Sequence, residues 1–137
     1  MSNKIALACI IDDDDMYVSL VKKIIEAKNL CQNLMVFQNG KAALNYFEVI
    51  LSNLDQKSIP EIIFLDLNMP VMDGWEFLDN FTRIKNKLGK AITLYVVSSS
   101  INPVDIERAK SINSVKDYLI KPVTIDDLET IFSGKRT

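Results

Sequence analysis

The stretch FLDLNMP, residues 64–70, ends an apolar run with a single acid, Asp66, and then turns sharply. The run before this acid, EIIFL at 61–65, is continuous rather than alternating, which is typical of a strand covered on both faces. Asn68 and Pro70 follow closely, and neither residue favours continuation of a central strand. We therefore predict a buried strand whose carboxyl end presents the Asp66 side chain.

Further apolar runs share this continuous pattern and alternate with segments of helical spacing. The runs are IALACII (5–11), LMVF (34–37), AITLYVV (91–97) and the weaker DYLI (117–120). The helical segments hold Met16, Leu20, Ile24 and Ala27; Ala43, Leu44, Phe47 and Ile50; Trp75, Phe77, Leu78, Phe81 and Ile84; Val104, Ile106, Ala109 and Ile112; and Leu128, Ile131 and Phe132. This alternation predicts an α/β protein with a parallel sheet, helices on both faces and right-handed crossovers.

The composition fits one compact domain. The 137 residues are 48% hydrophobic, enough for a single core and too few for two. With 16 basic and 18 acidic residues the net charge is −2, which gives no electrostatic reason to bind nucleic acid. No apolar run approaches the length of a membrane span, and the N-terminus lacks the features of a secretory signal. We expect a single cytoplasmic domain over residues 1–137 with no nucleic-acid or membrane partner.

The sequence contains no histidine, which excludes imidazole from catalysis and from metal binding. Its two cysteines, Cys9 and Cys31, lack CxxC spacing, so free and partly buried thiols are expected rather than a metal site or a disulfide. Any chemistry must therefore use carboxylates, hydroxyls and lysine.

Functional side chains follow four of the five predicted strands. Asp12 and Asp13 follow the first strand, Asp66 follows the third, Ser98 the fourth and Lys121 the fifth. The carboxyl ends of parallel strands lie at one edge of a sheet, where loops and helix N-termini surround a crevice. We therefore expect these residues to converge in space.

Bringing three carboxylates together is electrostatically unfavourable. Two carboxylates about 4 Å apart repel by roughly 4 kcal/mol at an effective dielectric constant of about 20. Lys121 is the one obvious cation near them, so a divalent metal ion is the simplest way to neutralise the site. Because histidine is absent and no cysteine is in place, oxygen ligands and Mg²⁺ are expected. Such a site, left partly open, is suited to accept a phosphoryl group.

Four motifs together resemble a response-regulator receiver domain, the phospho-acceptor module of two-component signalling. They are IIDDDD (10–15), FLDLNMPVMDGWEFL (64–78), YVVSSS (95–100) and DYLIKP (117–122), in the family's order and with nearly its spacing. The resemblance covers essentially the whole chain and implies a doubly wound, flavodoxin-like (βα)₅ fold with strand order 2-1-3-4-5. We also expect a stand-alone receiver without an effector domain, because little sequence follows the fifth predicted strand.

The resemblance assigns roles to the acidic residues and their neighbours. Asp66 would accept the phosphoryl group from a phosphohistidine on a sensor histidine kinase or a histidine phosphotransfer protein. Asp13, Asp66 and the backbone carbonyl of Asn68 would hold Mg²⁺, and Asp12 would act through a metal-bound water. A carboxylate is a competent nucleophile for phosphoryl transfer, so general chemistry supports the central role.

Three further roles follow from the same resemblance. Lys121 would pair with the phosphoryl oxygens, and Ser98 would move to hydrogen-bond them; ammonium, hydroxyl and metal all stabilise the charge of the transition state. Tyr118 occupies the position of the family's aromatic switch residue and would turn inward when Ser98 moves. The switch would act on an unidentified downstream protein through the fourth helix, the fifth strand and the fifth helix.

Other interpretations remain open. A one-residue shift would make Asp13 and Asp14 the acidic pair, but the first strand would then include Asp12. A receiver-like adaptor that binds partners without being phosphorylated is the second functional hypothesis. An aspartate-nucleophile phosphatase of the haloacid dehalogenase type is the third, although such enzymes use a second acid two residues on, where this chain has Asn68. We expect no enzymatic activity beyond the protein's own phosphorylation and dephosphorylation.

Overall fold

The computed structural model describes residues 4–53 and 55–134. Its strands are β1 (Ile5–Ile11), β2 (Cys31–Phe37), β3 (Ile62–Leu65), β4 (Thr93–Ser98) and β5 (Val115–Ile120). Its α-helices are α1 (Asp15–Ala27), α2 (Gly40–Leu51), α3 (Gly74–Ile84), α4 (Pro103–Lys110) and α5 (Ile125–Ser133). Two short 3₁₀ helices, η1 (Gln56–Ser58) and η2 (Lys85–Leu88), precede β3 and β4. The predicted alternation of strand and helix is confirmed.

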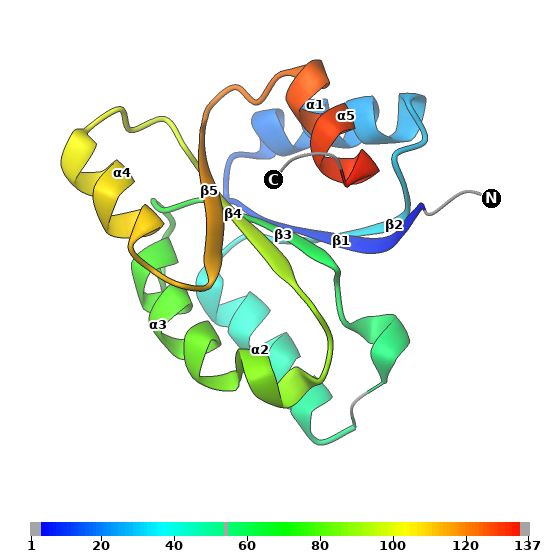
Figure 1. The fold of residues 1–137 in the computed structure, drawn as a ribbon, viewed down its shortest axis with the longest axis vertical. Coiled ribbons are helices and arrows are strands. Elements are labelled where there is room, and N and C mark those ends of the chain that lie inside the picture. Colours follow the sequence, from blue (N-terminus) through cyan, green and yellow to red (C-terminus); the bar gives the residue numbers. More distant parts are fainter. Residues whose placement is uncertain (1–3, 54, 135–137) are drawn as a thin grey trace.

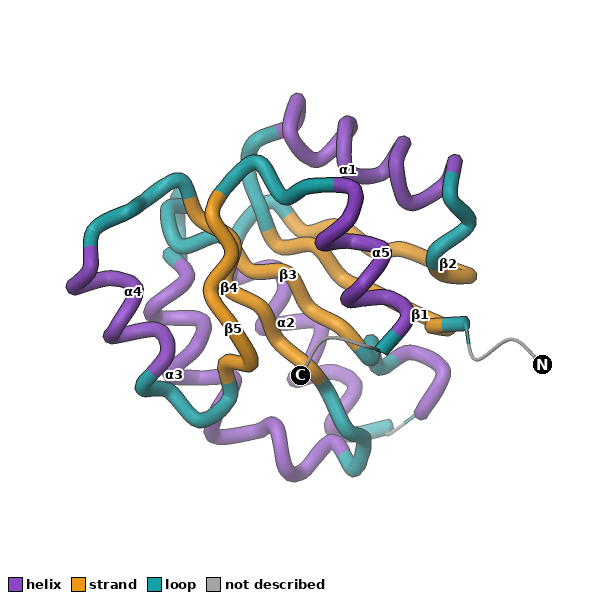
Figure 2. Tube along the Cα trace, turned by 45° about the horizontal axis from the view of Figure 1, so that its top comes forward, coloured by secondary structure: helices purple, strands orange, loops and turns teal. Residues whose placement is uncertain are grey.

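The strands form one parallel sheet in the order β2-β1-β3-β4-β5. Helices α1 and α5 cover one face of this sheet, and α2 and α3 cover the other (Figures 1 and 2). Helix α4 lies beside β5 and near the start of α3 (Figure 1), and its Ala109 joins the core on the α2–α3 side. This architecture confirms the doubly wound, flavodoxin-like fold and its predicted strand order.

Alternate residues of the central strands enter two cores on opposite faces of the sheet. In β1, Cys9 and Ile11 belong to the core beneath α2 and α3, whereas Ala8 and Ile10 belong to the core beneath α1 and α5. Burial of both faces explains why the strands read as continuous apolar runs.

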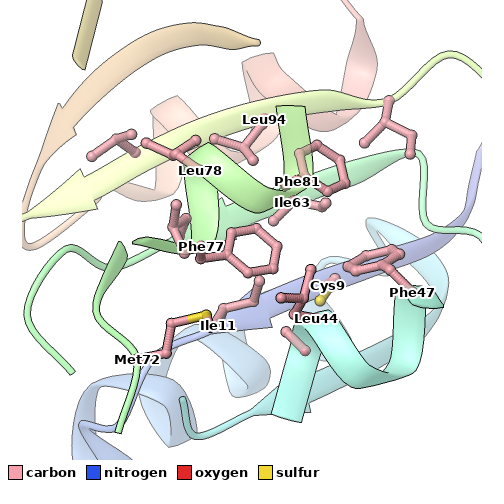
Figure 3. Close-up of a cluster of buried hydrophobic side chains, with 14 of the residues drawn as sticks. Cys9, Ile11, Leu44, Phe47, Ile63, Met72, Phe77, Leu78, Phe81 and Leu94 are labelled. Carbon is pink, nitrogen blue, oxygen red and sulfur yellow. The ribbon is translucent and has the colours of Figure 1, made fainter. Parts of the chain in front are cut away.

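Aromatic rings fill much of the core beneath α2 and α3. Phe47 of α2 faces Phe77 and Phe81 of α3 across this core (Figure 3). The rings of Phe77 and Phe81 are stacked, with centroids 5.4 Å apart and planes 15° apart. This packing holds α3 firmly against the sheet, so the loop that joins β3 to α3 runs between two fixed ends.

The edge strands are longer than the sequence predicts. Strand β2 begins at Cys31 instead of Leu34, and β5 begins at Val115 instead of Asp117. Each edge strand pairs with only one neighbour, so polar residues such as Gln32 are accommodated along it and the apolar pattern marks only part of its length.

Each α-helix begins with a side chain that caps its first turn. The caps, with the N–H groups that donate to them, are Asp14 with Tyr17, Asn39 with Ala42, Asp73 with Glu76, Asn102 with Val104, and Thr124 with Asp127. Such a cap typically stabilises a helix by about 1 kcal/mol. Because every α-helix follows a strand of the parallel sheet, the helix N-termini and their caps lie near the carboxyl edge of the sheet.

The buried face of α1 does not include all of the apolar residues whose spacing indicated this helix. Its buried residues are Val18, Val21 and Ile25. Met16 and Leu20, two of the residues whose spacing indicated the helix, are 85% and 52% exposed. The helix carries apolar residues on two adjoining faces, and the spacing of one face resembles that of the other. Two large apolar side chains are therefore left on the surface close to the carboxyl edge of the sheet.

Among the helices of the described ranges, none combines the length and the apolar composition that a membrane span requires.

Candidate functional site

Hydrogen bonds of the sheet continue into the residues that follow the strands. The N–H of Asp66 donates to the carbonyl oxygen of Ile11 at 2.9 Å, and the N–H of Lys121 donates to that of Ser98 at 2.9 Å. The N–H of Asp12 donates at 2.9 Å to the last residue of β2 in the same way. The sheet therefore fixes the backbone of each of these residues, and their side chains project from a rigid edge.

Three of the predicted acids meet at this edge. Asp12, Asp13 and Asp66 each offer a carboxylate oxygen, and these oxygens lie within 4.8 Å of one another. Asp12 and Asp66 are 2% and 6% exposed, whereas Asp13 is exposed. The cluster thus has a buried floor and one side open to solvent. Hard divalent cations prefer such all-oxygen ligands, so the cluster could hold one.

The alternative acidic pair, Asp13 and Asp14, is wrong. Strand β1 ends at Ile11, so Asp12 lies outside the strand and points into the cluster. The Asp14 carboxylate instead accepts a hydrogen bond from the N–H of Tyr17 and caps α1. The third and fourth acids of the run therefore begin the helix, while the first two belong to the site.

Lys121, the residue after β5, lies beside the acidic cluster. Its Nζ lies 2.9 Å from Oδ2 of Asp12 and 3.8 Å from Oδ1 of Asp66, and its side chain is 14% exposed. Nζ also lies 4.6 Å from the centroid of the Tyr17 ring. One ammonium thus serves two buried carboxylates, and it pairs more closely with Asp12.

The environment of Asp66 raises the pKa of its carboxyl from 3.8 to about 6. Burial is the largest cause, followed by the charge of Asp12. The ammonium of Lys121 and a hydrogen bond from the backbone of Asn68 act in the opposite direction, and Asp13 adds a further small increase. Asp66 is therefore mostly ionised at neutral pH but poorly solvated, which suits a nucleophile or a metal ligand.

The loop after β3 approaches Asp66 very closely. The N–H of Gly74 donates to the carbonyl oxygen of Leu67 at 2.9 Å. A Cβ atom on Gly74 would lie 2.4 Å from the carbonyl oxygen of Asp66 and 2.8 Å from the Cα of Leu67. Only glycine fits at this point, so α3 can start directly against the backbone of Asp66.

Val71 occupies an unusual conformation in the same loop. Its φ is 68°, its side chain is 79% exposed, and the Met72 N–H donates to the carbonyl oxygen of Pro70 at 2.7 Å across it. A β-branched residue with positive φ is strained, because its Cβ crowds the backbone. The tight turn therefore has a conformational cost next to the acidic site.

Ser98 and Tyr118 meet at the loop between β4 and α4. Ser98 is fully buried, and its Oγ accepts a hydrogen bond from the N–H of Ser100 at 3.1 Å. The Tyr118 hydroxyl donates to the carbonyl oxygen of Ser100 at 2.8 Å, and the Tyr118 residue is 8% exposed. Ser100, in the loop after β4, is thus hydrogen-bonded to both predicted switch residues. The side chain of Tyr118 is already buried in this structure, in which Ser98 is bonded to Ser100.

Both cysteines are free, as predicted. Cys9 is buried in the core beneath α2 and α3, and burial raises the pKa of its thiol. Burial also raises the pKa of the half-buried Cys31. Neither belongs to the acidic cluster, so these thiols take no part in the site.

Tyr17 borders the site and was not identified from the sequence. Its hydroxyl is hydrogen-bonded to the backbone of Val123, and its ring lies against Lys121. Burial raises the pKa of Tyr17 to about 12. The hydrogen bond to Val123 lowers this pKa, and the nearby acids raise it further. The Tyr17 hydroxyl is therefore neutral at physiological pH. Its position one turn after Asp13 is the only sequence signal that could have indicated it.

The strand order, together with an acidic cluster beside a lysine and a buried serine at one edge of the sheet, defines a receiver-type α/β domain. The sequence model of the response regulator receiver domain matches residues 8–133. The chain belongs to this family, whose members act in two-component signalling and receive phosphoryl groups from histidine kinases.

Individual relatives agree with this assignment. The chain is 32% identical over 120 residues to the probable methanogenesis regulatory protein FilR2 of Methanothrix harundinacea, covering 88% of this chain and 74% of that protein. It is 26% identical over 133 residues to the response regulator Rcp1 of Synechocystis, covering 97% of this chain and 88% of Rcp1. Among solved structures, a two-component response regulator from Cytophaga hutchinsonii superposes with a TM-score of 0.80 at 28% identity, covering 97% and 98% of the two chains.

Proposed function

We propose that this receiver domain accepts a phosphoryl group on Asp66 from a phosphohistidine donor, in a reaction that requires Mg²⁺. The observation that carries the proposal is the Asp66 carboxylate itself, which is desolvated, clustered with two other acids and 3.8 Å from the Lys121 ammonium. Such a carboxylate needs a cation for its full ionisation and then presents a concentrated charge to an electrophile.

The donor set supports a divalent cation. Asp13, Asp66 and the backbone carbonyl of Asn68 would bind Mg²⁺, with Asp12 holding a coordinated water. Rcp1, the relative from Synechocystis, has been solved in a Mn²⁺-bound form, with a TM-score of 0.72 to this chain. When bound, Mg²⁺ would neutralise the carboxylates and stabilise the charge that develops on the transferred phosphoryl group.

In the proposed transfer, an oxygen of Asp66 forms a bond to phosphorus while the bond from phosphorus to the donor imidazole breaks. The leaving imidazole keeps the electron pair of that bond and takes up a proton from solvent. Lys121 would turn from Asp12 toward the phosphoryl oxygens, and Ser98 would donate its hydroxyl to another of them. The product is an aspartyl phosphate on Asp66.

Phosphorylation would act through the loop between β4 and α4. Ser98 is now bonded to the N–H of Ser100, so a Ser98 that turns to the phosphoryl group must give up that bond. Because Tyr118 is bonded to the carbonyl of Ser100, a shift of this loop changes the environment of Tyr118. We propose that this change is read by a downstream protein on the surface formed by α4, β5 and α5.

The exposed apolar residues favour protein partners. Among the described residues, those at or near the carboxyl edge of the sheet are Met16, Leu20, Val71, Ile101, Val104, Ile120 and Ile125, whereas Val49 lies on α2. Large apolar side chains gathered around a reactive site are typical of a surface that docks other proteins. A histidine kinase or phosphotransfer protein would deliver its phosphohistidine across this surface.

We further propose that this receiver domain works in the cytoplasm. It would have no nucleic-acid or membrane partner and no catalytic activity apart from its own phosphorylation and dephosphorylation. The absence of histidine and the small net charge of −2 support this part of the proposal.

Intact-mass spectrometry after incubation with acetyl phosphate tests the central proposal. We expect one phosphoryl adduct on the wild-type protein, dependent on Mg²⁺ and absent from Asp66→Asn. Asp79→Asn, which removes an exposed acid from α3, should react like the wild type. An adduct that persists in Asp66→Asn would overturn the assignment.

If no adduct forms on the wild type, beryllofluoride separates the two remaining explanations. Binding of this phosphoryl mimic together with Mg²⁺ would indicate an aspartyl phosphate that hydrolyses too quickly to detect. Failure to bind it would refute the phospho-acceptor proposal and leave a constitutive adaptor.

A further inference from the structure

Tyr17 contacts both ends of the short segment that carries Lys121. Its ring lies 4.6 Å from the Lys121 Nζ, and its hydroxyl is hydrogen-bonded to the backbone of Val123. Tyr17 lies in the first turn of α1. Its contacts with Lys121 and Val123 link that helix to the β5–α5 loop. The roles proposed above for Asp12, Asp66 and Lys121 do not use this residue.

Lys121 needs an external constraint on its position. Its ammonium lies between two carboxylates at 2.9 Å and 3.8 Å, and its four-carbon stem has many rotamers. A carboxylate pair alone attracts a flexible ammonium toward whichever acid is nearer and less hydrated. The face of an aromatic ring attracts the same cation from another direction and excludes water from it.

We infer that Tyr17 is a positioning residue for Lys121: its ring holds the ammonium between Asp12 and Asp66, close to where a phosphoryl group on Asp66 would lie. The hydroxyl bond to Val123 holds the ring in that orientation. The inference deepens the proposed function and rests on it for the phosphoryl group, but the contact between Tyr17 and Lys121 is independent of that function.

A small cavity makes the ring important for solvent exclusion as well. The cavity has a volume of about 10 Å³ and is lined by Asp12, Tyr17 and apolar residues of both flanking helices. That volume is about the minimum for one water molecule. A shorter side chain at position 17 would enlarge the cavity beside the carboxylate of Asp12. Water could then hydrate Lys121 and weaken its hold on both acids.

Two substitutions distinguish the contribution of the Tyr17 ring from that of its hydroxyl. Tyr17→Phe keeps the aromatic face and loses the bond to Val123, whereas Tyr17→Leu keeps an apolar side chain and loses the face. Tyr46→Leu is the matched control, because Tyr46 is also half-buried and lies on the other side of the sheet. Its hydroxyl also bonds to the backbone, donating to the carbonyl oxygen of Ser58 at 2.6 Å.

The first readout is the rate of adduct formation with acetyl phosphate and Mg²⁺. We expect Tyr17→Leu to slow this rate about tenfold, the effect of losing a partly desolvated cation–π contact. Tyr17→Phe should stay within about threefold of the wild type, and Tyr46→Leu should react at the wild-type rate even where it lowers thermal stability. Equal rates for Tyr17→Leu and the wild type would refute the inference, as would an equal loss in Tyr17→Phe and Tyr17→Leu.

The second readout requires no phosphorylation. In NMR spectra of the metal-free protein, the ring current of Tyr17 should shift the ε-methylene protons of Lys121 upfield. We expect this shift to survive in Tyr17→Phe and to disappear in Tyr17→Leu. If the wild type forms no adduct, the proposed function fails while this measurement still decides whether Tyr17 positions Lys121. An unchanged Lys121 signal in Tyr17→Leu would show that it does not.

Discussion

The ammonium of Lys121 lies 2.9 Å from a carboxylate oxygen of Asp12. The same ammonium lies 3.8 Å from a carboxylate oxygen of Asp66. Lys121 therefore neutralises the charge of Asp66, the proposed acceptor, less well than the charge of Asp12. Burial and the charge of Asp12 together raise the pKa of Asp66 to about 6. Without a bound metal ion, the surroundings of Asp66 therefore favour the protonated form of its carboxyl group.

Asp66→Asn should stabilise the metal-free protein at neutral pH. The Asp66 pKa is about 6 in the folded protein against an ordinary value of 3.8, so between these pH values the folded state holds a proton that the unfolded chain lacks. Stability from this group is complete below pH 4 and is lost as the pH rises through 6. The shift corresponds to about 3 kcal/mol at pH 7. Urea unfolding from pH 4 to 8 measures it.

Magnesium should reverse this effect. Mg²⁺ binds the ionised carboxylates of the folded state, so it should stabilise the wild type more at pH 7 than at pH 5. At both pH values it should stabilise Asp66→Asn much less than the wild type. The exposed substitution Asp79→Asn serves as the control. If the stability difference between wild type and Asp66→Asn does not depend on pH, the raised pKa is incorrect.

Gly74→Ala should damage both the fold and the site. Its Cβ would lie 2.4 Å from the carbonyl oxygen of Asp66, so either the start of α3 or the end of β3 must move. We expect a loss of about 2 kcal/mol in unfolding free energy, typical of overpacking, together with slower reaction with acetyl phosphate.

Gly134→Ala provides the comparison for Gly74→Ala. Gly134 has a φ of 77°, but a Cβ atom added to it would have no neighbouring atom within 4 Å. Its replacement should cost about 1 kcal/mol through backbone strain alone and leave the phosphorylation rate unchanged. Equal phosphorylation rates in the two variants would contradict the proposed role of Gly74 in placing Asp66.

The acidic cluster was predictable because two independent signals agreed. Continuous apolar runs located the ends of β1 and β3, and parallel topology brought the residues after those ends to one edge. Asp12 and Asp66 therefore follow from local sequence and from a general property of the fold. Their convergence did not depend on knowing how any side chain packs.

The features that escaped prediction depend on packing between distant residues. The helical periodicity of α1 fits two adjoining faces, so it did not reveal that Met16 remains exposed while Val18 is buried. Tyr17 contacts Lys121 only after the last crossover has formed. The positive φ of Val71 runs against the preference of a β-branched residue, so no local pattern indicated it.

Val71→Asn should stabilise the protein. Asparagine tolerates the left-handed conformation that Val71 adopts at φ 68°, and a valine side chain that is 79% exposed contributes little packing. We expect a gain of about 1 kcal/mol in unfolding free energy. Val49→Asn, at a 68% exposed helical position in α2, is the matched control and should give no gain. A destabilised Val71→Asn would indicate that the valine side chain has contacts that offset its backbone strain.

The guanidinium of Arg108 lies 4.0 Å above the ring of Trp75 and connects α4 to the start of α3. Trp75 is the only tryptophan, so its fluorescence reports on this contact without interference. Arg108→Ala should expose one face of the ring to water, shift the emission to longer wavelength and lower the unfolding free energy by about 0.5–1 kcal/mol.

Arg83→Ala is the control for this contact, because it removes the same charge from an exposed position on α3. Its emission spectrum should match that of the wild type.

The two variants should also differ on addition of beryllofluoride and Mg²⁺. If α4 moves when the site is filled, it carries Arg108 with it. The emission of the wild type and of Arg83→Ala should then change, and the emission of Arg108→Ala should change less. Identical responses in all three proteins would mean that α4 does not move relative to Trp75 when the site is filled.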